Sequence, residues 1–266
     1  IVTVEYPVEY VLPGINQAHV NTKAGMTFAS CLRSILRQDP NIIMVGEIRD
    51  QETAEIAMRS AQTGHLVLST MHTNDSVSAI VRLLDFGIPG YLISSSVTGI
   101  LAQRLVRKLC SCHREVKATQ NFQMRLAQLG VPRPPATMAV AAGCSKCDQT
   151  GYVGRIGIYE LLTVDDSIRA AIRLGGSIDQ IRDTSRSNGM RLMQEDAIEK
   201  VIKGTTSLEE ILRVIPMEAV KDGECEKCGR RVLPTYVYCP TCGTRCADGD
   251  SARQTHSREM VSEGVL

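Results

Sequence analysis

The stretch that decides the fold is Leu32–Asp50, which reads LRSILRQDPNIIMVGEIRD. Within it, Asn41–Gly46 is a continuous apolar run of strand length between a proline and a glycine, as expected of a central strand in a parallel sheet. Apolar residues at helical spacing precede this run over Met26–Gln38, and Thr27 is a suitable N-cap. Asp50 follows the run and is expected to cap another helix. The stretch therefore predicts a helix, a buried strand and a second helix in succession.

The same alternation continues on both sides of this stretch. Ile1–Val4 is a β-branched run, and His65–Thr70 (HLVLST) is another apolar run of strand length. Asn74 and Asp75 are expected to begin a third helix, and a longer helical pattern runs from about Ser94 to Leu109. Strands and helices that alternate with short connections indicate βαβ units, so we expect an α/β fold with a parallel sheet.

The pattern changes after residue 109. Two cysteine pairs enclose an amphipathic segment at Phe122–Leu129, and Tyr152–Leu162 then has the character of a strand. Four helical patterns follow, at Asp166–Leu174, Ile178–Ser187, Arg191–Ile202 and Leu208–Val214. A compact four-cysteine segment comes next, and we expect the polar last 20 or so residues to be disordered.

The composition excludes several classes of protein. In 266 residues, 43% are hydrophobic and 22% charged, which is ordinary for a globular chain and rules out wholesale disorder. Thirty basic residues against 29 acidic leave a net charge of +1, which gives no strong case for nucleic-acid binding. No apolar run approaches the roughly 20 residues that span a bilayer. The chain begins at Ile1 without a methionine, and we interpret it as a fragment that lacks an N-terminal part.

The C-terminal cysteines have the spacing of a metal site. Cys225-x-x-Cys228 and Cys239-x-x-Cys242 are each followed by glycine, and eight of the chain's ten cysteines fall in paired clusters. Because no secretory signal precedes them, metal binding is favoured over disulfides. Four thiolates suit a structural Zn²⁺, whose binding would supply much of the folding energy. Partner docking is one role, and nucleic-acid binding through the GRRVLPTYVY segment is the weaker alternative.

The other cysteine cluster is less regular. Cys144-x-x-Cys147 is a good metal-binding turn, but its partner reads Cys110-Ser-Cys112-His113. Either Cys110 and Cys112 both bind the metal in a tight loop, or Cys110 and His113 do so at the usual spacing. We expect Zn²⁺ here too, and the alternative is a loop without metal.

The central stretch also carries side chains suited to a nucleotide. Glu47 follows the apolar strand, at the place where P-loop enzymes present a carboxylate to the magnesium of ATP. Arg33 and Arg37 lie four residues apart, on one face of the expected helix, and could neutralise charge on a transferred phosphoryl group. The alternative is that both arginines are solvated and that Glu47 only ends a strand.

These residues resemble the secretion ATPase family that drives type II secretion and type IV pilus assembly. VTVEYPVEY resembles the family's aspartate box, NIIMVGEIRD its Walker B region and TGHLVLSTMHTN its histidine box. LAQRLVRKLC and TGYVGRIGIYELL resemble the entry to and exit from its metal-binding insertion. The resemblance runs from Ile1 to about Val214.

The resemblance implies a RecA-like P-loop fold, a hexameric ring, and ATP hydrolysis that moves a platform protein of the bacterial inner membrane from the cytoplasmic side. Glu5 would orient or activate the attacking water. Glu47 would act at the Mg²⁺ ion and the water. Arg33 and Arg37 would contact phosphate, within a subunit or across a subunit boundary. His72 would sense the γ-phosphate of ATP.

Two departures from the family pattern qualify this expectation. No G-x-x-x-x-G-K-[ST] loop occurs in the 266 residues, so this chain alone is expected to bind ATP poorly. In the family the loop lies upstream of the aspartate box, so its absence is better explained by truncation of the chain than by loss of the motif. Tyr6 stands where the family usually carries an acid. The alternative function is a non-hydrolysing, zinc-containing interaction or regulatory subunit of the same fold.

The resemblance and the composition together predict five regions. These are a partial RecA-like ATPase core at 1–109, a metal-binding insertion at 110–155, a helical region at 156–220, a zinc ribbon at 221–246 and a disordered tail at 247–266.

Overall fold

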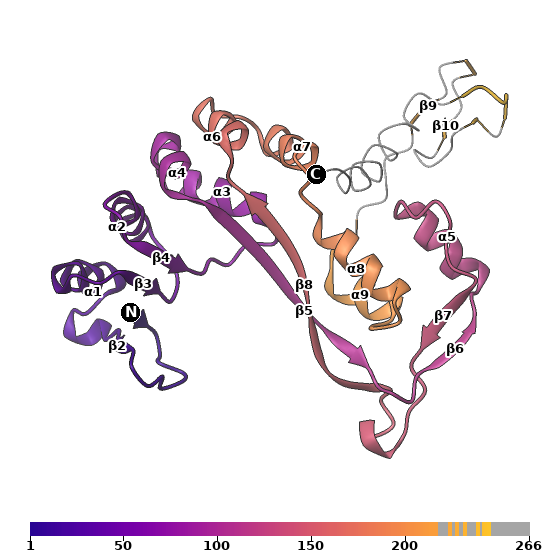
Figure 1. Ribbon diagram of the computed structural model, residues 1–266, viewed down its shortest axis with the longest axis horizontal. Helices are drawn as coiled ribbons and strands as arrows, with labels where there is room; N and C mark the ends of the chain where they lie inside the picture. The colour runs from indigo at the N-terminus through magenta and orange to yellow at the C-terminus, as the bar shows by residue number, and fades with distance from the viewer. Residues whose placement is uncertain (218–222, 225–226, 229–230, 233–237, 240, 246–266) are drawn as a thin grey trace, which may run out of the picture. The chain divides into compact units, whose positions relative to one another are not determined.

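The computed structural model describes residues 1–217, 223–224, 227–228, 231–232, 238–239 and 241–245 (Figure 1). The chain forms two compact units. The first comprises Ile1–Gln103 and Tyr159–Met193, and the second comprises Arg104–Ile158 and the residues from Gln194 onward. The predicted tail at 247–266 lies outside the described residues, and the five predicted regions remain a prediction. None of the helices among the described residues has the length and apolar character needed to cross a membrane.

A four-stranded parallel sheet forms the base of the first unit. Its strands are β1 (Val2–Glu5), β2 (Asn16–His19), β3 (Ile42–Val45) and β4 (Leu66–Ser69), and their order is β2-β1-β3-β4. All three pairings are parallel. The predicted α/β fold with a parallel sheet is confirmed. Because the strands are parallel, their carboxyl ends meet at one edge of the sheet.

Two helices pack on this sheet, and both begin at the predicted caps. Thr27 forms a capping box at the start of α1 (Phe28–Ile35), and Asp50 accepts a hydrogen bond from the backbone N–H of Thr53 at the start of α2 (Gln51–Gln62). A 3₁₀ turn, η1 (Thr22–Ala24), precedes α1, and another, η2 (Leu36–Gln38), follows it. The buried residues of this layer are aliphatic or small apart from one phenylalanine: Val4, Val20, Phe28, Cys31, Leu32, Ile35, Ile43, Val45 and Ala57.

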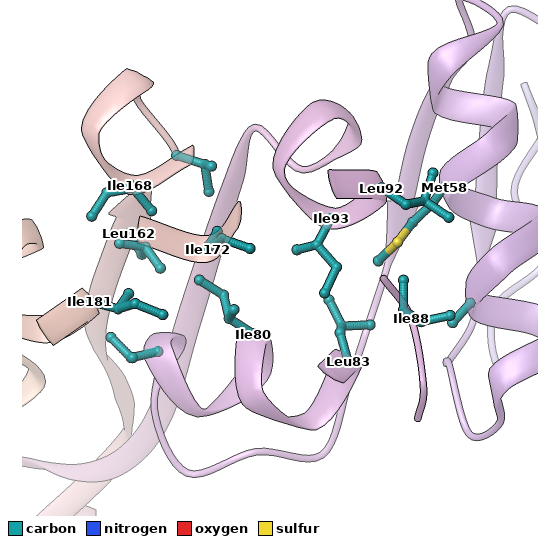
Figure 2. Close-up of a cluster of buried hydrophobic side chains, with 13 residues drawn as sticks. Met58, Ile80, Leu83, Ile88, Leu92, Ile93, Leu162, Ile168, Ile172 and Ile181 are labelled. Carbon is teal, nitrogen blue, oxygen red and sulfur yellow. The ribbon is translucent and has the colours of Figure 1, made fainter. Parts of the chain in front are cut away.

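A second core in the same unit is built largely from isoleucine and leucine, as Figure 2 shows. It is formed by α3 (Ser76–Asp85), α4 (Gly90–Ser96), α6 (Asp166–Arg173) and α7 (Ile178–Ser187), together with Ala54 and Met58 of α2. Fully buried members include Ile80, Ile93, Ile168 and Ile181. An aromatic content of only 4% leaves aliphatic side chains to fill this volume, and they do so without a buried aromatic ring in the cluster.

A buried carboxylate joins three elements of this unit. Glu160 lies in β8 (Tyr152–Thr163) and is 4% exposed. It accepts hydrogen bonds from the hydroxyl and the backbone N–H of Ser76, the latter at 3.0 Å. Its other oxygen accepts from the backbone N–H of Met193 at 3.0 Å. Glu160 therefore satisfies N–H groups in the first turns of two helices, which otherwise lack partners.

The predicted helix at Ser94–Leu109 is wrong beyond Ser96. Helix α4 ends there, and Gly99–Leu109 forms strand β5, which pairs with β8. The segment LAQRLVRKL is rich in good helix formers, but every second residue of the first half of the strand is exposed and those between are partly buried, as in a strand. Pairing with β8 overrides the local helix propensity.

The part of the second unit that the structure describes includes two antiparallel strand pairs and three helices. Strand β6 (Arg114–Lys117) pairs with β7 (Thr137–Val140), and α5 (Gln120–Gln128) lies between them in sequence. Further along are the 3₁₀ turn η3 (Ser145–Cys147), α8 (Met193–Ile202), which starts at the last residue of the first unit, and α9 (Leu208–Val214). Two short strands, β9 (Gly223–Glu224) and β10 (Arg231–Val232), form a second antiparallel pair.

Glu210 on α9 is the most strongly paired carboxylate of the described chain. Its side chain is 0% exposed and accepts from the guanidinium of Arg213 at 2.7 Å and from that of Arg107 at 2.8 Å. The backbone N–H of Arg107 also donates to it, at 2.9 Å. The Arg213 and Arg107 hydrogen bonds lower the pKa of Glu210 to about 2. The Arg107 guanidinium in turn lies 4.2 Å from the centroid of the Tyr152 ring.

Candidate nucleotide site and thiol centres

Three predicted site residues lie at the carboxyl edge of the parallel sheet. Glu5 is the last residue of β1, Glu47 lies two residues beyond β3, and His72 lies three residues beyond β4. The strands that carry them are neighbours in the sheet. Nε2 of His72 is 3.5 Å from Oε2 of Glu47.

Two hydroxyl groups, one from the last residue of β4 and one from the residue after it, fix the path of the chain at the end of β3. The Ser69 hydroxyl donates to the carbonyl of Val45 at 2.8 Å, and the Thr70 hydroxyl donates to that of Gly46 at 2.7 Å. On the other side, the backbone N–H of Gly46 donates to the carbonyl of Val4 at 2.8 Å. A Cβ atom on Gly46 would lie only 3.1 Å from that carbonyl oxygen. Glycine therefore permits β1 and β3 to stay paired up to the residues that carry the two carboxylates.

One oxygen of Glu47 pairs with an arginine, and the other accepts no hydrogen bond although His72 lies 3.5 Å from it. Its side chain is 12% exposed, and the guanidinium of Arg49 pairs with Oε1. Oε2 is buried and accepts no hydrogen bond from the described residues. The hydrogen bond from Arg49 lowers the pKa of Glu47, so the carboxyl is ionised at neutral pH. A buried carboxylate oxygen without a donor is unusual in a folded protein, and Mg²⁺ prefers such oxygen ligands.

Glu5 is held from the neighbouring strand. Its Oε1 accepts hydrogen bonds from Nε2 of Gln17 at 3.0 Å and from the hydroxyl of Thr3. Gln17 also accepts from the backbone N–H of Leu12 at 2.8 Å, so its amide is oriented at both ends. Sequence analysis missed Gln17. The only signal is a polar residue in a short strand, and its alignment with Thr3 and Glu5 depends on the pairing of β1 with β2.

Tyr6, which directly follows β1, and His19, the last residue of β2, extend the polar cluster. The Tyr6 ring lies 6.2 Å from that of His19, centroid to centroid. The Arg49 guanidinium carbon lies 5.9 Å from the centroid of the Tyr6 ring. Arg49 thus contacts two residues, Glu47 and Tyr6. The resemblance leads one to expect a carboxylate at the position of Tyr6. Sequence analysis missed His19, whose place at the end of a strand was not apparent from its neighbours.

The two predicted phosphate-binding arginines lie elsewhere. Arg33 is exposed on α1 and pairs with Glu52 in the first turn of α2. Arg37 is exposed in η2, five residues before β3 begins. It therefore precedes the amino-terminal end of this strand, whereas Glu47 follows the carboxyl end. Helix α1 ends at Ile35, so the two arginines do not share a helix. Within the described chain, neither arginine contacts the carboxylates of the sheet edge, and their role stays a prediction.

A four-thiol group lies in the second unit. Its ligand atoms, from Cys110, Cys112, Cys144 and Cys147, all lie within 4.8 Å of one another. Three of the Sγ–Sγ distances are 3.7, 3.8 and 3.9 Å. Four sulfurs at the usual Zn–S distance of about 2.3 Å form a tetrahedron with edges of about 3.8 Å. The spacing of the thiols therefore fits one tetrahedral metal ion.

The geometry brings Cys112, and not His113, into this group. Nδ1 of His113 lies 2.9 Å from the carbonyl oxygen of Cys110. Backbone N–H groups of Cys144 and Gly151 donate to the sulfur of Cys147 at 3.2 and 3.3 Å. A hydrogen bond from the Cys112 backbone lowers the pKa of the Cys110 thiol to about 7. Such N–H contacts stabilise thiolates, which are the metal-binding form.

A second thiol group includes Cys228, Cys239 and Cys242, whose sulfurs lie within 4.8 Å of one another. Cys225, the predicted fourth member, lies outside the described residues.

The family described as type II/IV secretion system protein matches residues 1–213, which is most of the chain. The chain belongs to this family. Type II secretion system protein HxcR of Pseudomonas aeruginosa is 51% identical over 214 residues, which cover 80% of this chain and 42% of HxcR. The type IV pilus assembly ATPase PilB of Thermus thermophilus is 50% identical over 211 residues, which cover 79% of this chain and 24% of PilB. The chain therefore spans less than half the length of these relatives.

Solved structures agree with this assignment. The chain is similar to the crystal structure of the pilus retraction motor PilT with bound ADP, with a TM-score of 0.57 and 28% identity. That match covers 80% of this chain and 51% of PilT. The Legionella pneumophila ATPase DotB has the same fold, with a TM-score of 0.54 at 23% identity. The family predicted from the sequence boxes is confirmed.

Proposed function

We propose that this chain carries part of the nucleotide site of an ATP-hydrolysing motor for type II secretion or type IV pilus assembly. The observation that carries the proposal is the buried oxygen of Glu47, which accepts no hydrogen bond among the described residues and lies 3.5 Å from Nε2 of His72, at the sheet edge where β1 also ends in Glu5. The relatives support it, because PilB is named an ATPase and PilT is a motor with bound ADP.

Each residue of the edge has a separate role in this proposal. Glu47 would hold Mg²⁺ through Oε2, and the ion would neutralise charge on the phosphates of ATP. Glu5, oriented by Gln17, would accept a hydrogen bond from the attacking water and take its proton. The side chain of His72 is 91% exposed and can turn toward a phosphate while it stays close to Glu47.

The edge of β4 offers a place for the missing phosphate-binding loop. Among the described residues β4 pairs only with β3, and Leu66 and Leu68 are about half exposed. A P-loop follows a strand and precedes a helix. A parallel strand added beside β4 would bring such a loop to the same edge as Glu47. The proposed motor therefore needs a segment that the 266 residues do not contain.

The remaining expectations belong to the same proposal. Cys110, Cys112, Cys144 and Cys147 would hold a structural Zn²⁺ that fixes the insertion. The chain would act within a hexameric ring that contacts an inner-membrane platform protein from the cytoplasmic side. In such a ring the exposed Arg33 and Arg37 are available to the nucleotide of a neighbouring subunit.

The test is a chimera in which the part of HxcR that precedes its match is joined to this chain. We expect it to release phosphate from ATP in the presence of Mg²⁺. Glu47→Gln should abolish turnover while the chimera stays folded and still binds nucleotide. Glu55→Gln is the matched control, because that carboxylate lies on α2 and pairs with Arg59. It should leave turnover unchanged.

Two outcomes would contradict the proposal. Full turnover in the Glu47→Gln chimera would remove this carboxylate from the site. Tight Mg-ATP binding without any hydrolysis in the unmodified chimera would favour the alternative, a non-hydrolysing interaction or regulatory subunit of the same fold.

A further inference from the structure

The C-terminal segment lies outside the domain that the family defines. The family match ends at residue 213, and α9 ends at Val214. Cys225, Cys228, Cys239 and Cys242 all follow that point. A function for this segment therefore goes beyond the motor proposed above.

Two turns of this segment are built to the same plan. Glu224 pairs with Arg231, and Tyr238 pairs with Arg245, so that each antiparallel pair joins residues seven positions apart. In each case one cysteine follows the first paired residue directly and another comes three residues later. Cys239 and Cys242 occupy these places in the second turn, and Cys225 and Cys228 occupy them in the first. In sequence, Cys225 therefore stands where Cys239 stands in the second turn, although Cys225 itself lies outside the described residues.

The second turn has the geometry of a metal-binding knuckle. The backbone N–H of Gly243 donates to the carbonyl of Cys239 at 2.9 Å, and that of Cys239 donates to Thr244 at 2.7 Å. Gly243 has a φ of +69°, which suits glycine and closes the turn tightly after Cys242. Cys239 itself is buried. These hydrogen bonds fix the backbone of the turn that carries Cys239 and Cys242.

The sulfurs of the two turns converge. Sγ of Cys228 in the first turn lies 3.7 Å from Sγ of Cys239 in the second, and Cys242 completes a group within 4.8 Å. A spacing of 3.7 Å matches the edge of about 3.8 Å expected for thiolates around one Zn²⁺, and is well beyond an S–S bond of about 2.05 Å.

We propose that Cys225, Cys228, Cys239 and Cys242 bind one Zn²⁺ in a second metal centre that is separate from the secretion-system domain. Each turn supplies two thiolates, so neither turn forms the site alone. Four thiolates in a closed tetrahedral site favour Zn²⁺, an ion that has no redox chemistry of its own. Metal binding supplies the folding energy of the segment.

The experiment measures metal in the full chain, purified under reducing conditions without added metal. We expect Cys239→Ser/Cys242→Ser to contain one zinc ion per chain fewer than the unmodified chain, and Cys225→Ser to show the same loss. Cys246→Ser is the control, because it removes a nearby cysteine outside the repeat, and it should retain full zinc. Zinc held by the first thiol group remains in all of these variants, so a general failure to fold is distinguished from loss of the second centre.

A second measurement does not depend on any variant. In the unmodified chain, alkylation followed by mass spectrometry should find the four cysteines protected until a strong chelator is added. Equal zinc content in the unmodified chain and Cys239→Ser/Cys242→Ser would overturn the proposal. So would iron in place of zinc, loss of zinc from Cys246→Ser, or rapid alkylation of the four thiols before chelation. ATP hydrolysis enters none of these readouts, so they are independent of the motor proposal.

Discussion

Glu47 in the first unit and Glu210 in the second are both arginine-paired carboxylates, and they differ in what their second oxygen does. Both oxygens of Glu210 accept from guanidinium groups, and its side chain is fully buried. Only Oε1 of Glu47 is paired with a guanidinium; the buried Oε2 accepts no hydrogen bond among the described residues and lies 3.5 Å from Nε2 of His72. A fully bonded buried carboxylate stabilises a fold, whereas one that is half bonded is suited to a ligand. The same residue type therefore has a structural role in one unit and a proposed binding role in the other.

The largest effect is expected from Glu210→Ala. Removing a buried carboxylate bonded to two arginines should lower the free energy of unfolding by about 2–3 kcal/mol, below the full value for a buried pair because both guanidiniums are partly exposed. Urea denaturation followed by circular dichroism measures it. Glu209→Ala is the control, since that neighbour is exposed and should change stability by less than about 0.5 kcal/mol. Equal effects of the two changes would remove the structural role of Glu210.

The contribution of Glu210 to stability should also depend on pH. The pKa of Glu210 is lowered from its usual 4.5 to about 2, so its contribution to stability is complete above pH 4.5 and is lost as the pH falls toward 2. The unmodified chain should therefore exceed Glu210→Gln in stability at neutral pH, and the difference should shrink to near zero at about pH 2. Urea midpoints at several pH values measure it. A difference in stability that stays constant with pH would show that the effect of Glu210 does not depend on its negative charge.

Glu47→Gln should have the smallest effect on folding. Arg49 is 56% exposed, and ion pairs with such partners contribute only about 0–1 kcal/mol. Making the donor-free oxygen neutral also removes a buried charge. We therefore expect a change of less than about 1 kcal/mol in the free energy of unfolding, measured by the same urea titration. A loss as large as that of Glu210→Ala would mean that Glu47 is structural, and the contrast between the two units would fail.

Local signals predicted the first unit well. Thr27 and Asp50 cap helices because capping depends on residues within one turn. The apolar run after Pro40 forms the predicted strand, with the side chains of Ile43 and Val45 fully buried. The segment Gly99–Leu109 was predicted as a helix because its own residues favour one, and the strand β8 that overrides this preference lies more than 40 residues away in sequence.

The candidate site was predictable only in part, for a similar reason. Parallel strands were expected from the βαβ pattern, and they bring Glu5, Glu47 and His72 to one edge of the sheet. Glu47 was expected there because it follows an apolar strand, whereas Glu5 and His72 were expected only from the family resemblance. Gln17 and His19 depend on the pairing of β2, and the choice of Cys112 over His113 depends on the turn geometry around Cys110. The position of Arg33 beside Glu52 depends on how two helices pack. Neither spacing nor composition contains that information.

The absence of a side chain at Gly46 limits how this edge of the sheet can evolve. A methyl group there would stand 3.1 Å from the Val4 carbonyl and 3.4 Å from Cα of Glu5, and would force the two backbones apart. The spacing of the carboxylate-bearing segments thus depends on the missing side chain, and a substitution at this position would widen the proposed nucleotide site before it altered any of the groups within it.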